Sequence, residues 1–179
     1  MIAQFEGYEI NPIHEGDAWK ICDFVIANTD RLKRYFPKTL EQNLNPTLSK
    51  IYVENRIKAF QNKEVFVFIL KQSETRKLIG LIILKNVDWD IKQGEFAYAI
   101  DYNFNGKKIM SKAIKALSTY AFETLGLERL QIIVHKDNQP SINVAINNSF
   151  NWQKTLKNEF TPTGEQPLDM ELYELYNER

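Results

Sequence analysis

The pattern of apolar and polar positions in the first hundred residues predicts two helices set among strands. The segment YEINPI, residues 8–13, is typical of an opening strand. Apolar and small residues recur at helical spacing over 17–35 and again over 46–63, and Pro37 is expected to end the first helix. Three strands rich in aromatic and β-branched residues, with polar turns between them, are predicted at 65–71, 77–89 and 95–102.

The pattern changes in the second half of the chain. Apolar residues three or four apart predict a helix over 107–125, which Gly126 ends, and a strand follows at 129–135. A strand, a helix and a strand with short connections predict a right-handed crossover between two parallel strands. A short helix is expected at 140–148, and the tail is expected to form an antiparallel pair. The sequence therefore predicts one domain over 1–179, with a mixed, mostly antiparallel sheet flanked by helices.

Composition limits the classes of partner and the cellular location, but it does not indicate a reaction. The 179 residues hold 23 basic and 23 acidic side chains, so net charge gives no sign of nucleic-acid or membrane binding. A single cysteine, Cys22, excludes an intrachain disulfide, and no apolar run is long enough to span a bilayer. With no basic region in MIAQFEGYEI to begin a signal peptide, we expect a cytoplasmic protein. One cysteine and two histidines predict no metal site.

The turn before the long helix has two interpretations from its residues alone. Gly106 lies between strand 95–102 and helix 107–125, where ligands bind beyond the carboxyl ends of strands. Backbone N–H groups in the first turn of a helix are free to bind a diphosphate, and Lys107 and Lys108 add positive charge. An ordinary turn with two solvated lysines fits the same residues.

Two motifs carry a resemblance to a known family. The turn reads NGKKIMS over residues 105–111, and after the second strand Asn138 and Ser141 precede a helix that leads to Phe150. These segments resemble the GNAT superfamily of acyl-CoA-dependent N-acyltransferases, closest to the RimJ/RimL-type ribosomal-protein N-terminal acetyltransferases. The resemblance is strongest over 93–150, and it implies seven strands and about four helices in an α/β (α+β) fold.

The match to the family's motifs is incomplete. Where the family's phosphate loop commonly reads Gln-Gly-Lys-Gly-Ile-Met, Asn105 replaces the glutamine and Lys108 replaces the second glycine. Ser149 stands where a glycine usually precedes the phenylalanine. The matching residues of the loop are Gly106, Lys107, Ile109, Met110 and Ser111.

The resemblance implies that the chain uses acetyl-CoA. The diphosphate is then expected on the backbone N–H groups of about 106–111, and Lys108, placed within the first helical turn, can keep helical dihedral angles. The pantetheine arm is expected to pair with backbone groups near Tyr98, Ile100 and Tyr102, and an N–H near Ile100 to stabilise the thioester oxygen. Asn138 is expected to orient the arm.

Two side chains are candidates for proton transfer, each with a structural alternative. Glu95 is the candidate base that removes a proton from the attacking amine, through water; alternatively, it is a solvated residue at the start of a strand. The resemblance implies Ser141 as the candidate donor to the leaving thiolate. Alternatively, Asn138 and Ser141 cap a short helix, and both roles are compatible.

Two functions therefore remain open on the sequence. The first is an N-acetyltransferase whose acceptor is a protein N-terminus or a small amine. The second is a catalytically degenerate relative that binds CoA or a protein, which the departures at Asn105, Lys108 and Ser149 favour. Dimers are common in the subgroup, so a homodimer is a further expectation.

Overall fold

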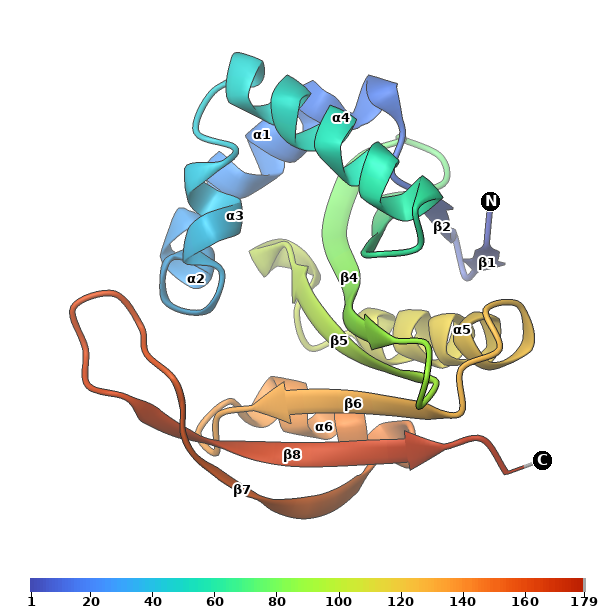
Figure 1. Ribbon diagram of the computed structural model, residues 1–179. Coiled ribbons are helices and arrows are strands. Elements are labelled where there is room, and N and C mark those ends of the chain that lie inside the picture. The colour runs from blue at the N-terminus through green and yellow to red at the C-terminus, as the bar shows by residue number, and fades with distance from the viewer. Residues whose placement is uncertain (179) are drawn as a thin grey trace. The chain divides into compact units, whose positions relative to one another are not determined.

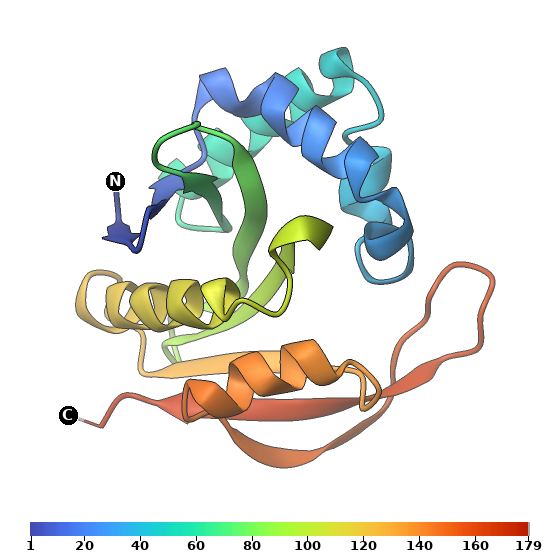
Figure 2. The ribbon, with the colours of Figure 1, turned by 180° about the vertical axis from the view of Figure 1, so that it is seen from behind.

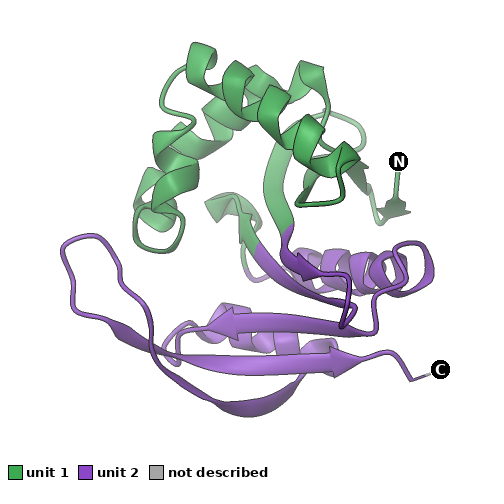
Figure 3. Cartoon of the chain, in the orientation of Figure 1, with its two compact units in different colours: residues 1–83, 98–105 green, residues 84–97, 106–179 purple. Residues whose placement is uncertain are grey.

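The computed structural model describes residues 1–178, which divide into two compact units (Figure 3). Unit 1 comprises residues 1–83 and 98–105, and unit 2 comprises the described residues of 84–97 and 106–179. Two strands, β4 and β5, contribute residues to both units. In the described chain the strands follow the order β1-β2-β3-β4-β5-β6-β8-β7.

The elements are numbered along the chain (Figure 1). The strands are β1 (Ala3–Phe5), β2 (Tyr8–Pro12), β3 (Phe66–Gln72), β4 (Leu78–Asp88), β5 (Gln93–Ile100), β6 (Arg129–Val134), β7 (Asn151–Phe160) and β8 (Leu168–Tyr176). The α-helices are α1 (Ala18–Ala27), α2 (Thr29–Tyr35), α3 (Pro37–Glu41), α4 (Pro46–Gln61), α5 (Ile109–Glu123) and α6 (Gln139–Asn147). Two short 3₁₀ turns are η1 (Glu15–Asp17) and η2 (Tyr102–Phe104).

Unit 1 packs helices α1, α2 and α4 against strands β3 and β4. The buried side chains that they share form one cluster: Ile13, Ile21, Phe24, Val25, Leu32, Tyr52, Val53, Val67, Ile69, Leu78, Leu81 and Ile83. A buried ion pair of 2.7 Å between Lys71 Nζ and Asp17 Oδ1 joins β3 to η1. Strand β2 pairs antiparallel with both β1 and β3.

Unit 2 contains the predicted crossover. The parallel pairing of β5 and β6 covers Gln93–Phe96 and Arg129–Ile132, with α5 between them in the chain. Strand β6 pairs antiparallel with β8, and β8 pairs antiparallel with β7. Helices α5 and α6 lie on the same face of this unit, with α6 over β6 and β8, as the two opposite views show (Figure 2). The apolar stripe of α5, which includes Ala113, Ile114 and Leu117, is buried.

The fold class is confirmed, although the counts differ. Within residues 1–178 there are eight strands and six α-helices, where the resemblance implies seven and about four. The predicted helix over 17–35 is two helices, because the Asn28 side chain bonds to the Phe24 carbonyl oxygen and its φ of −117° is not helical. Pro37 begins α3 instead of only ending a helix, since a helix can accept proline in its first turn. None of the helices within residues 1–178 has the length and apolar character needed to cross a bilayer.

Candidate functional site

The turn before α5 is exposed and left-handed at two residues. Gly106 has φ of +74° and Lys108 has φ of +59°, and both residues are exposed to solvent. Lys108 therefore does not adopt the helical dihedral angles that the sequence allowed for it, and the helix begins at Ile109, two residues after the predicted start. Lys108 is thus a left-handed N-cap of α5.

The first amides of α5 have no helical carbonyl to bond to. Lys108 is the N-cap, and its side chain makes no capping hydrogen bond. The amides of Ile109, Met110 and Ser111 precede Lys112, the first residue whose amide bonds to a carbonyl four positions back. The positive end of the helix dipole lies at the same place, so an anion is favoured there.

Ser111 ties this helix start to the end of α6. Asn147 Nδ2 donates to Ser111 Oγ at 3.3 Å, and Asn148 Nδ2 donates to the Ser111 carbonyl oxygen at 3.0 Å. The two side-chain amides therefore hold the first turn of α5 in position. Nothing in the sequence singles out either asparagine, because no local pattern indicates a contact over 36 or 37 residues.

Asn138 and Ser141 lie together at the start of α6. The Ser141 amide donates to Asn138 Oδ1 at 3.4 Å, so Asn138 is the N-cap of the helix. The capping role that the sequence predicts for Asn138 is confirmed, and Ser141, which is half-buried, belongs to the first turn. Its expected contact with a cofactor is a separate matter and stays a prediction.

Glu95 is buried and held by two side chains. It is the third residue of β5, only 9% exposed, and its backbone lies opposite Gln131 of β6. Asn86 Nδ2 donates to Glu95 Oε2 at 2.8 Å, and Lys85 Nζ lies 3.5 Å from Glu95 Oε1. The alternative in which Glu95 is a solvated residue at the start of a strand is therefore wrong.

Unit 1 holds the remaining candidates, at the end of β5 and in η2. The strand ends at Ile100 and not at residue 102 as predicted, because the Asp101 side chain accepts from the Asn103 amide and starts a 3₁₀ turn. Tyr102 is 73% exposed, and Asn105 is also exposed. Tyr98 is half-buried within the strand.

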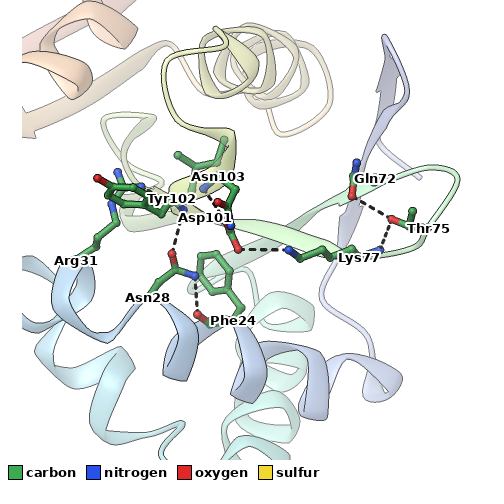
Figure 4. A network of polar contacts seen from close by, with 10 residues as sticks. Phe24, Asn28, Arg31, Gln72, Thr75, Lys77, Asp101, Tyr102 and Asn103 are labelled. Atoms are coloured by element: carbon green, nitrogen blue, oxygen red, sulfur yellow. Dashed lines mark hydrogen bonds and ion pairs between the residues drawn. The ribbon is translucent and has the colours of Figure 1, made fainter.

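A polar network secures this end of the strand to α1 and α2 (Figure 4). Buried Asn28 accepts from the Tyr102 amide at 3.1 Å, while its own side-chain amide donates to the Phe24 carbonyl oxygen at 2.8 Å. Arg31 Nη1 donates to the Ile100 carbonyl oxygen at 2.9 Å, and its guanidinium lies 5.6 Å from the centre of the Tyr102 ring. Sequence patterns indicate neither contact, since the partners lie 74 and 69 positions apart.

The candidate residues offer hydrogen-bond donors and acceptors from the backbone and from side chains. They comprise backbone N–H groups at a helix start, hydroxyl and amide side chains, and one buried carboxylate. Backbone N–H groups at a helix start suit an anionic ligand, and a buried carboxylate suits proton transfer. Within residues 1–178, no group of three or more His, Cys, Asp or Glu side chains is arranged to hold a metal ion.

Comparison with known proteins agrees with these features. Residues 9–151 match the family model described as "Acetyltransferase (GNAT) domain". The chain is 29% identical to the "Putative ribosomal N-acetyltransferase YdaF" of Bacillus subtilis over 138 residues, which covers 76% of this chain and 73% of that protein. It is also 29% identical to the spermidine N(1)-acetyltransferase of Escherichia coli over 101 residues, 52% of this chain and 54% of that enzyme.

Solved structures show the same fold. The ribosomal-protein-S5-alanine acetyltransferase from Vibrio fischeri superposes with a TM-score of 0.92 at 22% identity, over 98% of this chain and 96% of that one. A RimL ribosomal L7/L12 α-N-protein acetyltransferase in complex with coenzyme A superposes with a TM-score of 0.89 at 20% identity, over 98% and 97%.

Proposed function

This chain belongs to the acetyltransferase (GNAT) domain family, and from that premise we propose that it transfers the acetyl group of acetyl-CoA to a primary amine. The observation that carries the proposal is the turn from Gly106 to Ser111, where two left-handed residues lead into a helix start without a side-chain cap. A diphosphate needs closely spaced N–H donors and little steric hindrance. Gly106 adds to this, because a Cβ placed there would have no atom within 4 Å.

We propose that the diphosphate binds to the backbone of residues 106–111. Lys107 and Lys108 supply positive charge, and the Ser111 hydroxyl, which accepts from Asn147, keeps its own proton to donate. The main-chain amides make the specific contacts, so the side chain at position 108 adjusts affinity and does not create the site. Asn105, which precedes the turn, is a further proposed contact.

We propose Glu95 as the base and Ser141 as the proton donor. An amine attacks the thioester carbon only when it is neutral, and removal of its proton is the task of a carboxylate. The tetrahedral intermediate then expels the CoA thiolate, which a hydroxyl stabilises by donating a hydrogen bond. Glu95 is buried and paired with Lys85, and the paired segment of β5 fixes its backbone in unit 2. Asn138 holds the first turn of α6, on which Ser141 lies.

The pantetheine contacts near Tyr98, Ile100 and Tyr102 stay proposals, and two backbone groups of these residues already have hydrogen-bond partners. The Tyr102 amide bonds to Asn28, and the Ile100 carbonyl oxygen bonds to Arg31, so either group would have to exchange its partner to contact the arm. We keep the backbone near Tyr98, Ile100 and Tyr102 as the proposed contact of the arm, and the N–H of Ile100 as the proposed donor to the thioester oxygen. A cytoplasmic location, a homodimer and a single domain over 1–179 also stay predictions.

We propose a protein N-terminal α-amine as the acceptor to test first. The pKa of an α-amine is about 7.7–8.0 against about 10.4 for a lysine side chain, so a larger share is neutral near pH 7. Of the four similar proteins named above, three have names that concern ribosomal proteins and one has a name that concerns spermidine, so polyamines form the second arm of the test.

The test is an acetyl-CoA turnover assay with peptide N-termini and polyamines as acceptors. Glu95→Gln and Ser141→Ala are expected to lower kcat about a hundredfold and tenfold respectively. The matched control is Glu128→Gln, which removes an exposed carboxylate of the same unit that is paired with Lys92. No turnover with any acceptor, together with no thermal stabilisation by acetyl-CoA at millimolar concentration, would refute the proposal.

A further inference from the structure

Lys85 and Asn86 are consecutive residues of β4, and both reach the carboxylate of Glu95 on β5. Lys85 Nζ lies 3.5 Å from Oε1, and Asn86 Nδ2 lies 2.8 Å from Oε2. In a regular strand, consecutive side chains point to opposite faces. Two neighbours on one strand therefore do not ordinarily bond to the same group across the sheet.

The backbone of Asn86 explains how they do. Its φ is +49°, a left-handed conformation in the interior of a strand that extends from Leu78 to Asp88. A left-handed residue of this kind, as found in a β-bulge, breaks the alternation of the strand and redirects a side chain. Asparagine tolerates this conformation better than most residues, yet it remains strained relative to an extended strand. The chain thus keeps an unfavourable backbone conformation at the residue that donates to Glu95.

Burial makes this contact consequential. Glu95 is 9% exposed, so water has little access to replace a donor that is lost. Each of its two oxygens has a donor from β4, which fixes both the torsion of the carboxylate and the direction of its remaining lone pairs. The side chain of Lys85 is 42% exposed and its Nζ lies 3.5 Å away, whereas the amide of Asn86, at 2.8 Å, is the closer donor and the one expected to determine the angle.

We propose that Asn86 is a positioning residue for the acetyl-transfer reaction, which holds the Glu95 carboxylate toward the acceptor amine by means of its left-handed strand conformation. This role rests on the proposed function, with Glu95 as the base. Asn86 itself touches neither substrate nor the reacting atoms. It differs from a purely structural residue because its effect must appear in kcat and must vanish when Glu95 is gone.

The decisive variant is Asn86→Gly. Glycine adopts the left-handed conformation without strain, so the backbone is retained while the amide donor is removed. We expect kcat to fall about tenfold, the value of one hydrogen bond to a charged group, with KM for acetyl-CoA within about twofold of wild type. In a Glu95→Gln background the same change is expected to leave kcat unaltered, because the group that Asn86 positions is already absent.

Asn158→Gly is the matched control. Asn158 is also a left-handed asparagine within a strand of unit 2, with φ of +51°, but it lies on β7, and its backbone amide donates to Asp169 Oδ1 at 2.9 Å. Its replacement is expected to leave kcat and KM unchanged. Should Asn86→Gly fail to fold, Asn86→Asp keeps a residue that tolerates the conformation, removes the donor and adds a repulsive charge, and the same loss of kcat is expected.

The outcomes separate the two proposals. If the Glu95→Gln variant is slow but the Asn86→Gly variant is as fast as wild type, the positioning role alone is overturned. A Glu95→Gln enzyme as fast as wild type overturns the base assignment and the positioning role with it. A loss of kcat in Asn86→Gly that persists undiminished in the Glu95→Gln background assigns Asn86 a general structural role and overturns the positioning role as well.

Discussion

The end of α6 offers a stability prediction that depends on one backbone angle. Ser149 follows the helix with φ of +63°, and the chain there closes two hydrogen bonds: the Ser149 amide donates to the Ile146 carbonyl oxygen at 3.0 Å, and the Phe150 amide donates to the Ala145 carbonyl oxygen at 3.0 Å. This is the Schellman arrangement, in which the residue after the cap is usually glycine. Serine at this position bears the steric cost of the left-handed conformation.

Ser149→Gly is therefore expected to stabilise the protein. A side chain in the left-handed region costs about 1–2 kcal/mol, and glycine adds about 0.5–1 kcal/mol of chain entropy to the unfolded state, so the net gain is about 0.5–1 kcal/mol. For a chain of this size, that gain raises the melting temperature by roughly 1–4 °C. Urea denaturation followed by circular dichroism, with a parallel thermal scan, measures both quantities.

Two control variants test the physical origin of this gain. Ser149→Ala keeps the Cβ and removes only the hydroxyl, so it is expected to give no stabilisation. Gly126→Ala is the reverse change, because Gly126 has φ of +75° and a Cβ added there would have no atom within 4 Å; it is expected to cost about 1 kcal/mol through the backbone alone. Relief of backbone strain is refuted if Ser149→Gly is no more stable than wild type, or if Ser149→Ala gains as much.

Three further changes have expected outcomes. Lys108→Gly relieves the same kind of strain and is expected to add about 0.5 kcal/mol to the free energy of unfolding. Its affinity for coenzyme A, measured by calorimetric titration, is expected to change less than about fivefold. A larger loss of affinity would mean that the side chain makes the site. Asn28→Ala leaves the Tyr102 amide without its partner and is expected to cost about 1–3 kcal/mol in urea denaturation; an unchanged midpoint would refute the importance of that bond. Asp17→Asn leaves the Lys71 charge buried without a counter-ion and is expected to cost about 3–5 kcal/mol in the same measurement, whereas a loss below about 1 kcal/mol would show that water reaches the lysine.

Sequence patterns predict the long elements well. Helix α4 begins at the predicted Pro46 and α5 contains the predicted apolar stripe, because 16 and 15 residues give a periodic signal several turns long. Short elements are not predicted: β1 has three residues, and α3 has five. The break at Asn28 is not predicted either, since an asparagine side chain competes with the helix backbone only where a distant partner, here the Tyr102 amide, fixes it.

Some features of the candidate site can be predicted from the sequence and others cannot. Gly106 and the pair Asn138 and Ser141 are visible in the sequence, because glycine at a turn and Asx before a proline-led helix are local signals. The burial of Glu95 is not visible, since it depends on donors from β4 and on the paired segment of β6. Left-handed backbone at Lys108 is not visible either, because lysine is ordinarily a good helix residue and no local pattern marks this one as the N-cap of α5.

The two non-glycine residues at the family's glycine positions bear on whether the site is intact. Lys108 and Ser149 both depart from the motif in sequence, yet both adopt the left-handed conformation that a glycine would supply, with φ of +59° and +63°. A lysine free to relax would extend α5 by one residue and gain a helical bond. The chain instead bears about 1–2 kcal/mol of strain at each position and keeps the shape of the turn and of the cap. Because both residues keep the left-handed conformation that a glycine would supply, the departures at Lys108 and Ser149 lose their weight as evidence for the catalytically inactive alternative.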